Sequence, residues 1–320
     1  MITAENILMI GSLLIFTSIL ISKTGYRFGI PTLLLFLIVG MLFGSDGLGI
    51  EFHSAADAQF IGMIALSIIL FSGGMDTKLQ EIRPVLFPGI VLSSLGVLAT
   101  TILTGLFIFF LSDHTDADIS LTLLVSMLLA ATMSSTDSAS VFNLLRSQRM
   151  NLKHNLRPML ELESGSNDPM AYMLTIVLIQ VVGSGSELSI GVLLKDLFLQ
   201  FLFGGVIGYA AGRFAGWLIN KINLSNSSLY PILLLSIVFM TFTLTDTIRG
   251  NGYLAVYIAG VVIGNMRLAY RKETNTFMNG MTWLSQIIVF LTLGLLVNPH
   301  EMLDIAGVAL LIGVFMIVVA

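Results

Sequence analysis

The chain has 320 residues, of which 56% are hydrophobic and only 11% are charged, and its formal net charge is −4. A soluble domain carries about 25% charged residues, so this chain has too few charges to cover a water-facing surface. Its composition therefore excludes an ordinary soluble domain and predicts a polytopic membrane protein. The absence of cysteine also excludes disulfides and thiolate metal sites.

Eleven hydrophobic segments follow one another along the chain, and none shows the alternation of a β-strand. The sequence thus predicts an all-α fold, because helices satisfy their own backbone polar groups within a bilayer. The first segment has no basic residue ahead of it and no clear cleavage site, so we expect a retained helix rather than a signal peptide. The segments lie roughly at 4–22, 30–45, 58–75, 85–111, 119–145, 157–182, 196–219, 229–247, 252–269, 277–297 and 305–320.

Basic residues alternate between the loops that join these segments. Alternate loops hold 13 of the 15 Lys and Arg residues, whereas only Lys195 and Arg249 fall on the opposite side, where the loops are acidic. The positive-inside rule places the basic loops in the cytoplasm and the N-terminus outside. The last segment, residues 305–320, is apolar to its final residue. We expect from this that the chain is truncated and that further helices follow in the full-length protein.

Two polar stretches interrupt consecutive segments at similar depth. Asp137 lies nine residues from Arg146, and Asp168 lies eleven residues from Arg157, the basic residues that mark the inner ends of these segments. At about 1.5 Å per residue, both carboxylates lie roughly 15 Å deep, near the middle of a hydrocarbon core about 30 Å thick. A carboxylate at that depth costs about 2.5–3.5 kcal/mol on insertion scales. The pair therefore predicts a path for a small cation or a proton.

The stretch around Asp137 also predicts an irregular backbone. Residues 134–140 are small and polar and include few helix-forming residues. Their hydroxyls can compete for backbone groups, so we expect the helix to unwind near Thr136 and to expose carbonyl oxygens to an ion. An ordinary helix with one paired Asp137 is the alternative.

The sixth segment places its polar residues on two adjoining stripes. Ser164 and Asp168 share one helix face, and Glu163 and Asn167 share another, because each pair is four residues apart. Pro169 cannot donate a backbone hydrogen bond, which frees one carbonyl of the preceding turn beside these groups. The alternative is that Asp168 is a buried structural carboxyl held neutral.

The remaining polar residues indicate less specific roles. Glu161 is four residues from Arg157, which favours an interfacial ion pair over a role in transport. The four His residues all lie in loops, where we expect them to face solvent. The sequence has no phosphate loop, no zinc-type spacing and no basic stripe for nucleic acid. We therefore expect no cofactor, no metal other than a transported alkali cation, and no nucleic-acid partner.

The two polar stretches resemble motifs of a known family. Thr136-Asp137 followed one helix later by Glu163-Ser164-Gly-Ser-Asn167-Asp168 is similar to the monovalent cation:proton antiporter family, the sodium or potassium/proton exchangers. The stretch 250–265 is similar to the ninth helix of that family. The string at 163–171 most resembles the bacterial potassium/proton antiporter branch associated with cell-volume regulation. The resemblance covers essentially the whole chain.

This resemblance implies an architecture for residues 1–320. It implies an inverted-repeat antiporter bundle with discontinuous helices, truncated here after about eleven transmembrane segments. The protein would be a multi-pass homodimer of the bacterial inner membrane with a role in pH homeostasis. Dimerisation helices are expected at 1–75 and 229–297, the core transport helices at 85–182 and 305–320, and a linking helix at 196–219.

The resemblance also implies residue roles. Asp168 matches the carrier, which binds a cation or a proton in competition. Positions that shape or ligate the ion site are matched by Thr136, Asp137 and Ser164. Asn167 stands where electrogenic relatives have a second Asp, which implies electroneutral exchange. Glu163 matches a carboxylate that pairs with an Arg of a later core helix, and residues 301–320 contain no Arg, so this fragment is not expected to transport alone.

Two other functions stay open on the residues themselves. A sodium-coupled solute symporter would share broken helices, but it would need a larger polar cavity. A non-transporting membrane sensor or scaffold would keep its activity when Asp168 is replaced. An enzyme is least favoured, because the sequence has no nucleophile–base pair or metal cluster at depth. The exchanged cation is expected to be K⁺ or Na⁺.

The predicted topology can be tested by labelling, because the native background has no cysteine. We expect an Asn151→Cys protein in intact cells to resist a membrane-impermeant thiol reagent and to react after the cells are opened. The reason is that position 151 lies in the basic loop between Arg146 and Arg157, which the positive-inside rule places in the cytoplasm. Labelling from outside would contradict this topology.

Overall fold

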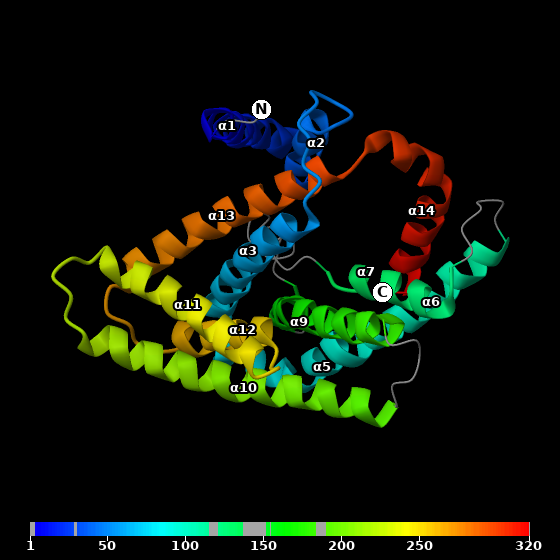
Figure 1. The fold of residues 1–320 in the computed structure, drawn as a ribbon. Helices are drawn as coiled ribbons and strands as arrows, with labels where there is room; N and C mark the ends of the chain where they lie inside the picture. Colours follow the sequence, from blue (N-terminus) through cyan, green and yellow to red (C-terminus); the bar gives the residue numbers. More distant parts are fainter. Residues whose placement is uncertain are drawn as a thin grey trace. The chain divides into compact units, whose positions relative to one another are not determined.

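The computed structural model describes residues 4–28, 31–114, 121–136, 152–153, 155–183 and 190–319. The regular secondary structure in these ranges is helical, and they contain no strand, as predicted for an all-α polytopic membrane protein (Figure 1). The chain divides into two compact units. The first comprises Met1–Ile69 and Asn275–Ala306, and the second comprises Leu70–Thr274 and Gly307–Ala320.

The helices of the first unit come from both ends of the chain. They are α1 (Ala4–Phe28), α2 (Thr32–Phe43), the first part of α3 (Ala55–Asp76), most of α13 (Arg271–Leu296) and the start of α14 (Pro299–Val319). Besides the remainders of α3, α13 and α14, the second unit holds α4 (Leu79–Ile82), η1 (Arg83–Val85), α5 (Leu86–Val91), η2 (Leu92–Gly96), α6 (Val97–His114), α7 (Leu123–Met133), α9 (Leu156–Gly183), α10 (Ile190–Lys221), α11 (Leu229–Thr247) and α12 (Gly252–Gly264).

A helix lies within each hydrophobic segment that the sequence predicts. The segment at 119–145 is helical only over α7 in the described part of the chain. Six helical stretches of that part are long and apolar enough to cross a bilayer: Ala55–Asp76, Leu79–Asp113, Lys195–Lys221, Leu229–Thr247, Arg271–Leu296 and Pro299–Val319. The number of spans, the inverted repeat and the division into dimerisation, core and linking helices stay predictions.

In the first unit, α2 and α13 pack with their backbones in contact. A Cβ atom on Gly40 would lie only 2.8 Å from the Cα of Gly294, and a Cβ on Gly294 would lie 2.8 Å from the Cα of Gly40. Such close approach is possible only because both positions lack a side chain. The two glycines therefore set where these helices cross.

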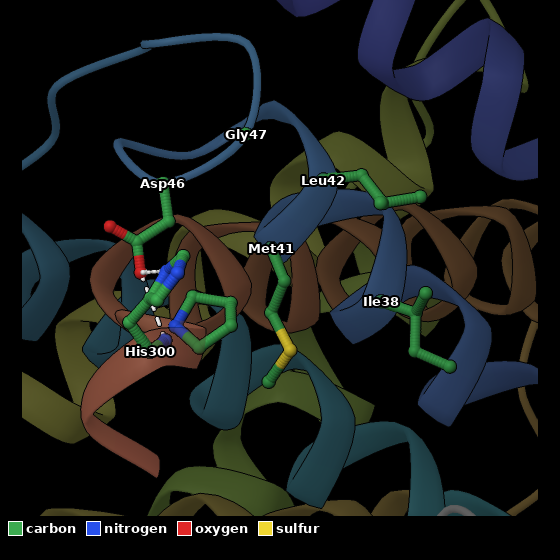
Figure 2. Close-up of a pocket in the computed structure, with 7 residues that line it drawn as sticks. Ile38, Met41, Leu42, Asp46, Gly47 and His300 are labelled. Atoms are coloured by element: carbon green, nitrogen blue, oxygen red, sulfur yellow. Dashed lines mark hydrogen bonds and ion pairs between the residues drawn. The ribbon is translucent and has the colours of Figure 1, made fainter. Parts of the chain in front are cut away.

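The loop after α2 is tied to the beginning of α14 in the same unit. The Asp46 carboxylate accepts a hydrogen bond from the backbone N–H of His300 at 3.0 Å, and the His300 ring lies 3.4 Å from the same oxygen. An acidic group suits this position, because the first N–H groups of a helix lack partners within the helix. Figure 2 shows these two residues beside a pocket of about 330 Å³. Its other lining residues are Ile38, Met41, Leu42, Gly47 and Pro299.

The second unit is organised around α12, in which ten of 13 residues are buried. The longer helix α10 lies along one side of it (Figure 1). Four glycines of α10 recur at every fourth position. Gly204, Gly208 and Gly212 face α12 and its N-cap, and Gly216 faces Met266 just after α12. A Cβ on Gly212 would lie 2.9 Å from the carbonyl oxygen of Ala259, and one on Gly208 would overlap the backbone of Ala255. This spacing of small residues brings the two helix backbones together.

Another side of α12 contacts the C-terminal part of α3 in the same way. A Cβ on Gly260 or Gly264 would overlap the backbone carbonyls of Phe71 and Met75, respectively. Because backbone atoms cannot move aside as side-chain ends can, these contacts fix the distance between the helices. The helix α12 is thus held by backbone contact on two sides.

The C-terminal end of α12 is closed by polar side chains. Asn265 accepts a hydrogen bond from the backbone N–H of Leu79 at 2.9 Å and donates one to the carbonyl oxygen of Thr77 at 2.8 Å. The guanidinium of Arg271 donates to the carbonyl of Gly264 and, at 3.2 Å, to that of Met266. The bond from Arg271 satisfies a terminal carbonyl of α12 that has no partner within the helix, and the bonds of Asn265 join this end to the segment after α3.

The α10–α12 contact predicts a difference between two neighbouring glycines. We expect Gly208→Ala to lower stability by about 1–3 kcal/mol, because its methyl group meets the backbone of Ala255. Gly205→Ala is the control, since a Cβ there has nothing within 4 Å and alanine is the better helix former. Thermal unfolding of the purified proteins in detergent measures the difference. Equal midpoints for the two variants would contradict backbone contact at Gly208.

Candidate cation-binding site

The predicted break in the fifth segment is present in the described residues. The helix α7 ends at Met133, and residues 134–136 are not helical. The hydroxyl of Ser134 donates to the carbonyl oxygen of Ala131 at 2.8 Å, which is the competition for backbone groups that the sequence predicts. Asp137 lies outside the described residues, so its distance from Asp168 stays a prediction.

The unwound end of α7 meets α9 through a polar network. The hydroxyl of Thr136 lies 3.2 Å from that of Ser164 and accepts a hydrogen bond from the side-chain nitrogen of Asn167 at 2.7 Å. The same nitrogen donates to a carboxylate oxygen of Glu163 at 3.0 Å. The structure therefore brings together four of the residues that the sequence singles out.

This network is largely enclosed. Ser164 is completely buried, Asn167 is 1% exposed, and Glu163 is half-buried. The side-chain oxygen of Asn167 is buried and has no hydrogen-bond partner among the described residues. A buried unpaired oxygen costs roughly 1–3 kcal/mol, and a proton donor or a cation would remove that cost. Thr136 remains exposed, so the network is open on the side of α7.

Asp168 follows Asn167 on α9 and is half-buried. It lies one helical turn after Ser164, as the four-residue spacing predicts. The helix α9 runs for 28 residues and continues through Pro169. An uninterrupted α9 thus presents Ser164, Asn167 and Asp168 within little more than one turn.

The two glutamates of α9 have different partners. Glu161 forms an ion pair with the Nε of Arg157 at 3.0 Å, so the predicted interfacial pair is confirmed. Glu163 is bound by the amide of Asn167, a donor that the sequence analysis did not foresee although it noted their spacing. The expected Arg partner of Glu163 stays a prediction.

Two residues contact α9 from α12 and its N-cap, and neither was assigned a role from the sequence. A Cβ on Gly165 would lie 2.8 Å from the ring of Tyr257, so the glycine makes room for this buried side chain. The side-chain nitrogen of Asn251 donates to the carbonyl oxygen of Pro169 at 3.0 Å. The only sequence signal was an Asn at the start of an apolar helix, which is typical of an N-cap.

The chain matches a family model over residues 12–320, and that model describes the transmembrane sodium/hydrogen exchanger. The chain belongs to this sodium/hydrogen exchanger family. It is 42% identical over 316 residues to the K(+)/H(+) antiporter NhaP of Alkalimonas amylolytica, which covers 96% of the chain and 53% of that relative. It is 40% identical over 319 residues to the K(+)/H(+) antiporter NhaP2 of Shewanella sp. (strain MR-4), which covers 98% and 53%.

The chain thus spans about half the length of the curated relatives it matches. Among solved structures, it resembles the sodium proton antiporter MjNhaP1 from Methanocaldococcus jannaschii at pH 8, with a TM-score of 0.82 and 22% identity. That match covers 98% of this chain and 76% of the other. The likeness shows a shared fold. The relatives named here are antiporters rather than enzymes.

The polar network predicts that the Thr136 hydroxyl stabilises the exchanger. We expect Thr136→Val to cost about 1 kcal/mol, because Asn167 and Ser164 each lose a hydrogen-bond partner. Thr132→Val is a matched control, since the hydroxyl of Thr132 donates to the carbonyl of Leu129 within its own helix. Thermal unfolding of the purified variants compares the two. A midpoint for Thr136→Val no lower than that of the control would contradict the network.

Proposed function

We propose that the protein is a secondary active transporter that exchanges K⁺ or Na⁺ for H⁺ across the cytoplasmic membrane, and that it is not an enzyme. The observation that carries this proposal is the junction at which the unwound end of α7 meets α9. There Thr136, Ser164 and Asn167 supply hydroxyl and amide oxygens, and Asp168 is the next residue of α9 after Asn167. Oxygen atoms are the ligands that hard cations prefer. The antiporter names of relatives that are about 40% identical also support it.

Asp168 is the carrier in this proposal. A charged carboxylate is costly in a bilayer, and either a proton or an alkali cation neutralises it. Because the two ligands neutralise the same group, they compete for it. Binding of the cation releases the proton, and binding of the proton releases the cation. One-for-one exchange then follows if the occupied carboxyl is exposed to the two sides of the membrane in turn.

The remaining residues of the site shape the cation's surroundings. The unpaired side-chain oxygen of Asn167 and the hydroxyls of Thr136 and Ser164 are assigned as ligands or as groups that position them. Asp137 is assigned to the same site because it directly follows Thr136 in the sequence. Glu163 is assigned a structural role, because its carboxylate is held by Asn167.

The exchange is proposed to be electroneutral. Asn167 is a neutral amide that holds Thr136 and Glu163 together, so it adds no second titrating charge beside Asp168. Each cycle then moves one cation against one proton. The protein is proposed to act as a homodimer in the inner membrane, with its N-terminus outside and with roles in pH homeostasis and cell-volume regulation.

The proposal predicts that Asp168→Asn abolishes proton flux driven by an alkali-cation gradient. The reason is that an amide can neither release a proton nor balance the charge of a cation. The full-length protein is reconstituted in liposomes, and internal pH is followed with K⁺ and Na⁺ in turn. Asp57→Asn is the control, because Asp57 is an exposed residue in the first turn of α3.

We expect the Asp57→Asn protein to keep the exchange, and we expect an imposed membrane potential to leave its rate unchanged. Substantial exchange by a folded, inserted Asp168→Asn protein would remove the carrier role of Asp168. Absence of cation-driven proton flux in the unaltered protein would overturn the proposed function and favour a sensor or scaffold.

A further inference from the structure

We propose that Asn251 is a positioning residue for the cation site, because it holds the backbone of α9 immediately after Asp168. The inference rests on the proposed function. Asn251 is 1% exposed and lies just before α12. Its side-chain nitrogen donates to the carbonyl oxygen of Pro169 at 3.0 Å. Pro169 directly follows Asp168, so this bond restrains the backbone one residue after the carrier residue.

The bond to Pro169 goes beyond what an N-cap requires. The side-chain oxygen of Asn251 accepts from the backbone N–H of Leu254 at 2.9 Å, which caps α12. Ser, Thr and Asp cap helices about as well as Asn, because a cap needs only an acceptor. Asn alone among these four brings an NH₂ group as well. In this protein that group is directed at another helix.

The restraint acts where α9 is weakest. Pro169 lies inside the helix and lacks a backbone N–H, so one hydrogen bond of the preceding turn is missing. Prolines are where helices commonly bend. The hydrogen bond from Asn251 to this same residue limits the bending and keeps Asp168 one helical turn after Ser164.

The anchor itself is held firmly. The backbone N–H of Asn251 donates to the carbonyl oxygen of Gln200 in α10 at 3.1 Å. A Cβ on Gly204 of α10 would lie 2.9 Å from the Asn251 carbonyl oxygen, and one on Gly252 would lie 2.7 Å from the ring of Phe242 in α11. The start of α12 is therefore packed against two helices and offers a fixed point for α9.

A second contact brackets the site from the other side. Tyr257 of α12 packs against Gly165 of α9, one turn before Pro169. The two contacts run in opposite directions along the helices, as expected for an antiparallel pair. Residues 166–168, which include Asn167 and Asp168, lie between them. Helix α12 thus holds α9 on both sides of the groups that are assigned to the ion.

Asn251→Ser separates the two roles of the side chain. Serine keeps the N-cap of α12, but it lacks the side-chain amide that binds the Pro169 carbonyl and is too short to replace it. Asn251→Asp also keeps the cap, but it places a carboxylate oxygen against that carbonyl oxygen. We therefore expect Asn251→Asp to weaken cation binding more than Asn251→Ser does.

The test measures the cation dependence of proton flux in the full-length protein in liposomes. Displacements well below 1 Å disturb preorganised sites, and a misplacement of 1 Å can cost about 100-fold. For Asn251→Ser we expect the apparent KM for K⁺ or Na⁺ to rise by about 10-fold, with the maximal rate per folded protein nearly unchanged. Asn265→Ser is the matched control. It removes bonds to Thr77 and Leu79 at the other end of α12, about 20 Å away, and should keep the original KM.

Each result bears on a different claim. An unchanged KM in Asn251→Ser, with or without a lower thermal midpoint and rate, would leave the Pro169 bond at most a stabilising contact and overturn the inference. An equal rise in KM in Asn265→Ser would also overturn it, because the effect would not be specific to the Pro169 bond. Absence of cation-driven flux in the unaltered protein would instead overturn the proposed function, and this inference with it.

Discussion

Backbone contact between helices is the constraint on which the second unit of this protein depends. Burial of apolar side chains does little to hold helices together within lipid, so close packing and hydrogen bonds between helices must do so. Helix α12 meets this requirement through glycines on both partners: those of α10 face it, and its own Gly260 and Gly264 face α3. Because these contacts involve backbone atoms, they leave little room for sliding. The position of α9 is therefore defined relative to a rigid neighbour.

Several polar residues of α9 are paired, some within the helix and some with the residues that follow α7. Arg157 pairs with Glu161 near the end of the helix, and the Asn167 amide holds both Glu163 and Thr136. A bilayer penalises an unsatisfied polar group more than water does, so this network depends on the helices staying in place. The packing that stabilises the unit thus also lowers the free-energy cost of a buried polar site.

The sequence predicted the parts of the fold that follow from local composition. Hydropathy located the helices, the run of Ser and Thr indicated that α7 ends before Thr136, and four-residue spacing indicated the Arg157–Glu161 pair. The roles of Asn251 and Tyr257 were not predicted, because each depends on a contact with a residue more than 80 positions away. Local patterns identify Asn251 only as a cap. No spacing rule within one helix can show that its free NH₂ group points at Pro169.

A neutral amide at position 167 has a structural role as well as the proposed functional one. Its NH₂ group donates to a hydroxyl just after α7 and to a carboxylate on α9, and a carboxylate at this position could donate to neither. The amide can thus join the two helices without adding a charge beside Asp168. Its oxygen remains buried and without a partner in the described network. In the proposed exchange, Asp168 supplies the titrating charge, and a proton or an alkali cation neutralises it. The side-chain oxygen of Asn167 is available to either of them.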